Sequence, residues 1–176
     1  EIHNISVSLP QKGASWIHKK SILDSYHIED TILKIILNDK IAPGHTSRLD
    51  LIWTHHVGEM VERAGFYSGQ YNMAQWYPKI AVYDQKGWNA DFFHAEGEFY
   101  GEFGTFEVQF TMPKAFVVAA TGVVINGDPG WKDVQVDTSL DFNIWRDIFD
   151  STNTIDSKNE LRSVTFQAEN VHDFAW

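Results

Sequence analysis

The chain has 176 residues and a formal net charge of −10, and it contains no cysteine. The acidic balance disfavours binding to nucleic acid or to anionic lipid, because a negative surface repels phosphate groups. The lack of cysteine excludes disulfide bonds, thiolate zinc sites and cysteine nucleophiles. Hydrophobic residues form 43% of the chain, which is enough for one domain with a sizeable core. No apolar run approaches the roughly 20 residues of a membrane-spanning helix.

The first part of the chain is predicted to form short strands. Apolar and polar residues alternate in Glu1–Leu9 and in Arg48–Val57, a pattern typical of strands with one buried face. Thr31–Leu37 is a short β-branched run that also fits a strand, and Ser15–Asp24 fits a strand with a polar loop. Gly58–Asn72 carries three glycines and predicts a long loop.

The second part continues this pattern. We expect strands over Trp76–Asp84, within Phe99–Met112, over Phe116–Ile125 and over Leu161–Ala168, and a loop over Gly87–Gly97. Many short strands separated by frequent turn residues predict an all-β fold, either a curved sheet or a β-sandwich of mainly antiparallel strands.

One short helix is predicted, over residues 139–150. Leu140, Ile144 and Ile148 lie four residues apart, so they share one helical face, and either Thr138 or Ser139 suits the position of an N-cap. A single helix does not change the all-β class.

The usual catalytic motifs are absent from the sequence. No H-E-x-x-H zinc motif, nucleophile elbow or phosphate-binding glycine loop occurs. His55, His56 and Glu59 come nearest to a metal motif, but their spacing matches no zinc motif, and we expect His56 to face solvent. The acidic cluster of Glu96, Glu98 and Glu102 fits a solvated rim. We therefore predict no catalytic residue and no metal ligand in this chain.

Aromatic residues leave two possibilities open. The seven tryptophans and twelve phenylalanines are efficient core fillers. Trp16, Trp53, Trp88 and Trp131 would instead support an autonomous carbohydrate- or peptide-binding β module if they formed an exposed platform.

Two stretches of the chain resemble one protein family. Gln75–Gly122 begins with Trp76-Tyr77-Pro78 and contains a strand-proline-strand unit around Pro113, and Gln167–Trp176 ends the chain. Together they resemble the N-terminal β domain of the aminopeptidase N-like (gluzincin) zinc metallopeptidases, most closely the bacterial branch. Gln75 stands where the common family pattern has arginine, and Lys79 stands where cysteine is common.

This resemblance implies that residues 1–176 form a single N-terminal β domain that is inactive alone. The catalytic domain, with its H-E-x-x-H motif and zinc, would follow Trp176, and the β domain would pack on it and form one wall of the substrate cleft. The family binds the free amine of its peptide substrate with a polar side chain near the proline motif. By position this is Gln70, with Asn72 and Gln75 as neighbours.

The start of the chain and its relatives suggest a larger, exported parent protein. Glu1 lies inside a predicted strand with no leader or initiating methionine, so we expect the chain to be a piece of a larger protein. Because the bacterial enzymes it resembles are often exported, we expect a periplasmic or cell-surface location. The expected partners are the catalytic domain and a peptide substrate.

Overall fold

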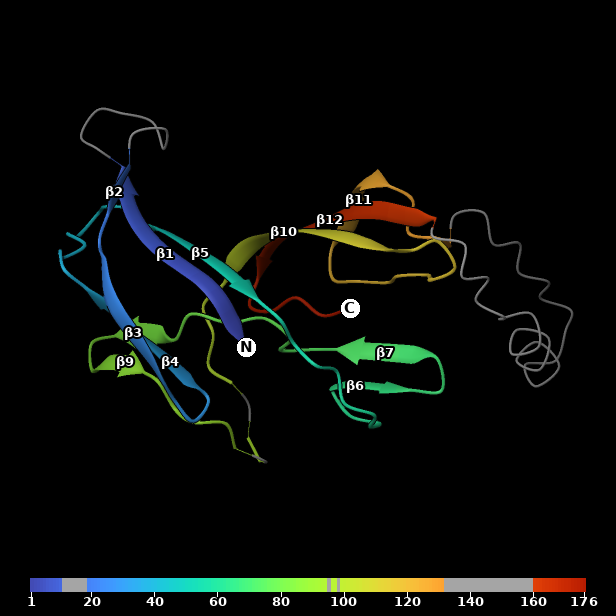
Figure 1. Cartoon of the computed structure of the whole chain (residues 1–176), viewed down its shortest axis with the longest axis horizontal. Coiled ribbons are helices and arrows are strands. Elements are labelled where there is room, and N and C mark those ends of the chain that lie inside the picture. Colours follow the sequence, from blue (N-terminus) through green and yellow to red (C-terminus); the bar gives the residue numbers. More distant parts are fainter. Residues whose placement is uncertain (11–18, 95, 98, 132–159) are drawn as a thin grey trace, which may run out of the picture. The chain divides into compact units, whose positions relative to one another are not determined.

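The computed structural model describes residues 1–10, 19–94, 96–97, 99–131 and 160–176. The described part is all-β and consists of several small antiparallel sheets, as the sequence predicts (Figure 1). The helix predicted over 139–150 lies outside the described residues. The chain divides into two compact units, the first formed by residues 1–57 and 80–100 and the second by residues 58–79 and 101–176.

The first unit contains a three-stranded sheet. Strand β1 (Ile2–Pro10) lies between β2 (Lys19–Ser21) and β5 (Arg48–Trp53) and is antiparallel to both. Alternate side chains of β1 are buried, including Ile5 and Val7, so the predicted strand at the start of the chain is confirmed.

Two hairpins complete the first unit. Strands β3 (Leu23–Glu29) and β4 (Ile32–Leu37) pair through a tight turn at Asp30, which adopts a positive φ of 51°. Strands β8 (Val82–Asp84) and β9 (Gly87–Asn89) form the second, shorter hairpin. Its turn is fixed by the Asp84 carboxylate, which accepts a hydrogen bond from the backbone N–H of Lys86 at 2.7 Å.

The second unit is built on the longest strands of the described chain. Strand β12 (Leu161–Val171) lies between β10 (Gly104–Pro113) and β11 (Val123–Gly127), and both pairings are antiparallel. One face of this sheet forms the main core. Along β10, half-buried side chains on this face alternate with exposed residues on the other face. The buried members of this core are Val118, Val164, Phe166, Ala168 and Phe174.

A hairpin replaces the long loop predicted over Gly58–Asn72, so that prediction was wrong. Strands β6 (Ala64–Tyr67) and β7 (Gln70–Met73) are joined by Ser68 and Gly69, whose φ angles are 48° and 81°. Two consecutive positive φ angles define a type I′ turn, the turn that best matches the twist of a hairpin. The glycines that suggested a loop therefore serve a tight turn between two strands.

Three predicted strands are shorter in the structure than in the sequence analysis. Within Trp76–Asp84, only the last three residues form a paired strand. Within Phe116–Ile125, strand pairing begins at Val123. The strand predicted over Arg48–Val57 ends at Trp53. In Trp76–Asp84, the strand is shortened because the preceding Gln75 has a positive φ of 55° and the side chains of Trp76 and Tyr77 donate hydrogen bonds to the C-terminal segment. Alternation of apolar and polar residues therefore does not determine the backbone there.

Candidate functional site

Side chains of residues 76–79 bind the C-terminal segment, so the two stretches that carry the family resemblance meet in the second unit. Trp76 Nε1 donates a hydrogen bond to the carbonyl of Phe174 at 3.0 Å. The Tyr77 hydroxyl donates to Asp173 Oδ1 at 2.9 Å. Lys79 Nζ donates to the carbonyl of His172. We call this cluster of residues 76–79 and 172–174 the junction.

Backbone hydrogen bonds hold the same segment on its other sides. Met73 and Trp176 exchange two bonds, of 2.7 and 3.0 Å, which is the pattern of one antiparallel pair. The backbone N–H of Thr121 donates to the carbonyl of Ala175 at 2.9 Å. Residues 172–176 therefore tie the end of β7 to the loop that precedes β11.

Aromatic packing closes the junction against the core. Phe174 is fully buried and its ring centroid lies 6.0 Å from that of Phe106 on β10. Trp176 packs edge-on against Phe110, with centroids 5.4 Å apart, and against Trp76. Such edge-to-face pairs add stabilisation beyond the burial of their area.

The environment of Tyr77 changes its acidity. Burial, and then the hydrogen bond to Asp173, raise the pKa of Tyr77 well above its ordinary value near 10. A neighbouring carboxylate that accepts a hydrogen bond from the phenol stabilises the neutral form, so Tyr77 acts as a hydrogen-bond donor at physiological pH.

Two of the three predicted substrate-binding residues lie together. Gln70 and Asn72 stand two residues apart on the same face of β7, and Gln70 Nε2 donates to Asn72 Oδ1 at 2.7 Å. Gln70 is exposed and Asn72 is half-buried. Gln75 follows β7 as an exposed residue in a left-handed turn, outside this amide pair.

The Gln70–Asn72 pair has the chemistry to bind an ammonium group. Because Gln70 uses its amide nitrogen toward Asn72, its Oε1 carbonyl oxygen is available as an acceptor. A protonated amine has three donors and no acceptor, so it needs such oxygens. The β6–β7 hairpin is anchored by Met73 to Trp176, which fixes the position of the pair relative to the junction.

In the residues that the structure describes, no three His, Asp or Glu side chains gather in a way that could hold a metal ion. His55 and His56 are exposed, and His56 faces solvent as expected. Over the same residues, no helix has the length and apolar character to cross a membrane.

The tryptophans have different surroundings. Trp53 is half-buried, whereas Trp88 and Trp131 are exposed by 65% and 47%. Trp16 lies outside the described residues. Near the junction, Tyr71 is exposed, whereas Trp76, Tyr77 and Trp176 are half-buried.

No protein-family model matches the chain, and no curated protein or solved structure matches it either.

The sequence analysis missed the junction bonds because their partners lie far apart in the chain, 96 residues in the case of Tyr77 and Asp173. The sequence did carry one indication of this contact, because Gln75–Gly122 and Gln167–Trp176 resemble the same family and each contains aromatic residues next to polar ones.

Proposed function

We propose that this chain is the non-catalytic N-terminal β domain of an aminopeptidase N-like zinc metallopeptidase, and that it forms one wall of the substrate cleft. The observation that carries this proposal is the junction. The two strings that resemble the family are far apart in the sequence, yet they form one hydrogen-bonded cluster. An all-β fold also agrees with the role.

In this role the amide pair recognises the substrate's amino terminus. Gln70 Oε1 accepts a hydrogen bond from the substrate ammonium, and Asn72 fixes the orientation of the Gln70 amide through their 2.7 Å hydrogen bond. The Met73–Trp176 pair keeps the β6–β7 hairpin at the side of the domain where residues 172–176 lie. Holding the amino terminus would set which peptide bond is cut.

The chemical step belongs to the catalytic domain. A zinc ion there would polarise the scissile carbonyl and activate water. The present chain contributes binding and register only, so we expect it to be inactive when separated from that domain.

The test uses the parent protein, expressed from the gene that encodes this chain together with any following region. Gln70→Ala is expected to raise KM for an aminoacyl-anilide about tenfold or more, because a hydrogen bond to a charged group contributes about 1.5–3 kcal/mol. Zinc content should not change. Gln109→Ala, on the exposed face of β10, is the matched control and should behave like the parent.

Two results would contradict the proposal. One is a parent gene with no H-E-x-x-H motif. The other is robust hydrolysis by residues 1–176 alone with added zinc, since the proposal assigns them no catalytic group.

A further inference from the structure

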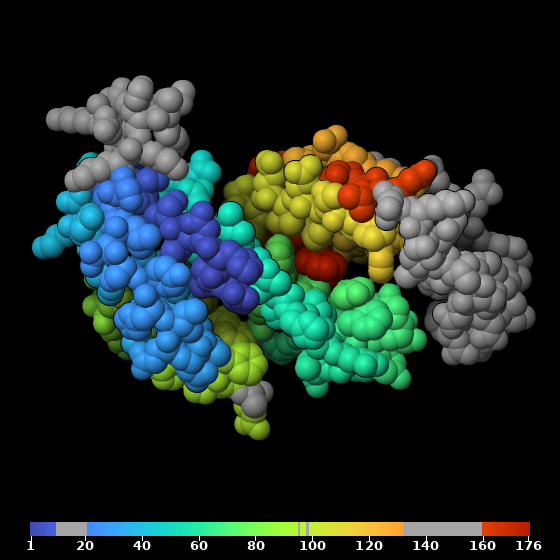
Figure 2. Space-filling view, in the orientation of Figure 1, coloured from blue at the N-terminus to red at the C-terminus, as the bar shows by residue number. Residues whose placement is uncertain are grey.

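The hairpin that carries the Gln70–Asn72 pair has a short neighbour on the β6 side. Residues 58–60 run parallel to β6, where Glu59 and Phe66 form a bridge. The backbone N–H of Met60 donates to the carbonyl of Phe66 at 3.1 Å. Met60 and the two strands therefore belong to one small sheet, and Figure 2 shows residues 58–73, in teal and green, at the surface of the molecule.

Met60 lies on the same face of this small sheet as the Gln70–Asn72 pair. A Cβ at Gly65 would lie 2.6 Å from Met60 Cγ and 2.5 Å from the Met60 carbonyl oxygen, so the methionine occupies the side toward which a side chain at position 65 would point. In the antiparallel register Gly65 lies opposite Asn72, and Tyr67 lies opposite Gln70. Directly opposed residues share a face. Met60, Tyr67 and the amide pair therefore form one surface, which we call the amide face.

The opposite face of the hairpin packs within the second unit. Phe66 and Tyr71 are paired across the hairpin with ring centroids 4.7 Å apart, and the Tyr71 ring lies edge-on to that of Phe116 at 6.0 Å. The amide face is turned the other way and is open to solvent, because the side chains of Met60 and Tyr67 are exposed by 47% and 58%.

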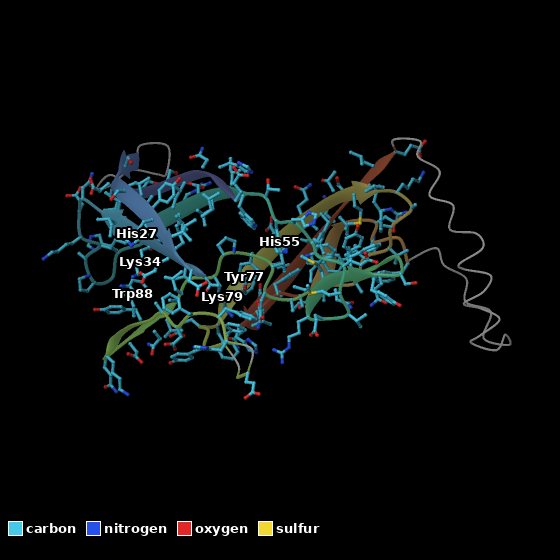
Figure 3. All side chains as sticks on the ribbon, turned by 60° about the horizontal axis from the view of Figure 1, so that its bottom comes forward. His27, Lys34, His55, Tyr77, Lys79 and Trp88 are labelled. Atoms are coloured by element: carbon cyan, nitrogen blue, oxygen red, sulfur yellow. The ribbon has the colours of Figure 1, made fainter. Side chains whose placement is uncertain are left out.

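The junction fixes the position of this hairpin. Met73, at the end of β7, is buried, and its backbone exchanges two hydrogen bonds with Trp176. Figure 3 labels Tyr77 and Lys79, whose side chains bind the same C-terminal segment. The amide face is thus carried on a hairpin that is anchored to the core by its other side.

The amide face places an apolar surface beside the acceptor oxygens. Cβ positions at Gly58 and Gly65 would lie 3.1 and 2.6 Å from atoms of the Met60 side chain, so this side chain rests on two residues that have none. Gly65 and Gln70 are diagonal neighbours across the hairpin, a separation of about 7–8 Å. One amino acid residue spans this distance when its ammonium group bonds to Gln70 Oε1 and its side chain lies on Met60.

The composition of the amide face selects the side chain that lies there. Met60, Tyr67, Gln70 and Asn72 carry no charge. A lysine or glutamate side chain on Met60 would lose water without gaining a charged partner among these four residues. An alanine side chain would leave the methionine uncovered. A leucine, methionine or phenylalanine side chain would cover it, and the flexible thioether adapts to each of these shapes.

We propose that Met60 is a specificity-determining residue, which selects peptides whose first residue has a large apolar side chain. The ammonium group bonds to Gln70 Oε1, the first side chain lies on Met60 beside Asn72, and the Tyr67 ring flanks it. This inference rests on the proposed function, because it assigns the substrate class of the same site.

The test compares kcat/KM of the parent protein for leucyl, methionyl, alanyl and lysyl anilides. We expect the leucyl and methionyl substrates to be preferred. Met60→Ala should lower kcat/KM for the leucyl substrate about fivefold or more and for the alanyl substrate less than about twofold, because lost contact with a methylene group affects only a substrate that makes it. Met60→Leu, which keeps an apolar side chain of similar size, should retain most of the preference.

The leucyl-to-alanyl ratio separates specificity from stability, because a variant that folds less well loses both activities together. Val61→Ala is the matched control: it removes a 70% exposed apolar side chain from the residue next to Met60, and the ratio should stay unchanged.

The outcomes distinguish this inference from the function on which it rests. If Gln70→Ala raises KM for all four substrates while Met60→Ala leaves the leucyl-to-alanyl ratio unchanged, the role of Met60 is overturned and the proposed function stands. A parent protein that prefers the alanyl or lysyl substrate overturns it in the same way. If Gln70→Ala changes KM for none of the substrates, or the parent protein hydrolyses none of them, both are overturned.

Discussion

Asp173 Oδ1 accepts two hydrogen bonds, one from the Tyr77 hydroxyl at 2.9 Å and one from the backbone N–H of Phe174 at 2.9 Å. The same carboxylate oxygen therefore orients the turn that leads into Phe174 and connects it to the aromatic string at residues 76–77. Because Phe174 is fully buried in the core, this contact couples a partly exposed polar pair to the packing of the second unit.

Removal of the Tyr77 hydroxyl tests how much this pair contributes. Tyr77→Phe keeps the ring that packs against Phe106 and deletes only the bond to Asp173. We expect the free energy of unfolding to fall by about 1 kcal/mol, the typical net value of one such bond. Denaturant unfolding followed by tryptophan fluorescence measures it. Tyr83→Phe is the control, because Tyr83 is largely exposed. Its unfolding free energy should lie within about 0.5 kcal/mol of that of the original chain.

Alkaline pH should reduce the contribution of Tyr77. Its pKa is raised in the folded chain, so below pH 10 the phenol is neutral in both states and the full contribution is present. Above about pH 10 the unfolded chain loses this proton while the folded chain retains it, so stability falls as pH rises. The difference in unfolding free energy between the original chain and Tyr77→Phe should therefore stay constant up to about pH 10 and shrink as the pH rises further. A constant or growing difference above that pH would contradict this.

Gly122 should tolerate no side chain. It has a φ of 91°, and a Cβ at this position would lie 2.1 Å from the carbonyl oxygen of Gln167 on β12. Gly69, in the β6–β7 turn, has a φ of 81° but no atom within 4 Å of its Cβ position. Gly69→Ala should cost about 1–2 kcal/mol of backbone strain. Gly122→Ala adds a clash with β12, so it should cost about 2 kcal/mol more. Equal costs in thermal or denaturant unfolding would argue against the observed approach of residue 122 to β12.

Strand positions could be predicted where one face of a strand is buried and the other is solvated. Residues 104–113 show this well, since Phe106, Val108 and Phe110 alternate with polar side chains that remain exposed. Prediction failed where long-range contacts decide the backbone. Trp76 and Tyr77 look like part of a strand, but their polar atoms bond to Phe174 and Asp173, and the chain there is irregular.

The candidate site was predictable only in part, because its geometry depends on backbone angles and strand pairing that the sequence pattern does not show. Gln70 and Asn72 were predicted from their position in the family resemblance, and their spacing of two residues gives them a shared face only because they lie on a strand. The sequence analysis put them in a loop, because the positive φ angles of Ser68 and Gly69 that make a hairpin are not visible in the glycine count. Gly65 and Asn72 face each other only because the β6–β7 register pairs them.

Truncation of Phe174 should show that the C-terminal segment is part of the core of the second unit. Phe174→Ala removes a fully buried ring that lies beside Phe106 and Phe110, so we expect a loss of about 3–5 kcal/mol in unfolding free energy. Phe103→Ala, in the same unit but 62% exposed, is the control and should change stability by less than about 1 kcal/mol. Hydrogen exchange should also accelerate at Met73 and Thr121, whose amides bond to residues 175–176. Unchanged exchange there, with global stability lowered, would mean that the Phe174 ring supports the core without holding the segment in place.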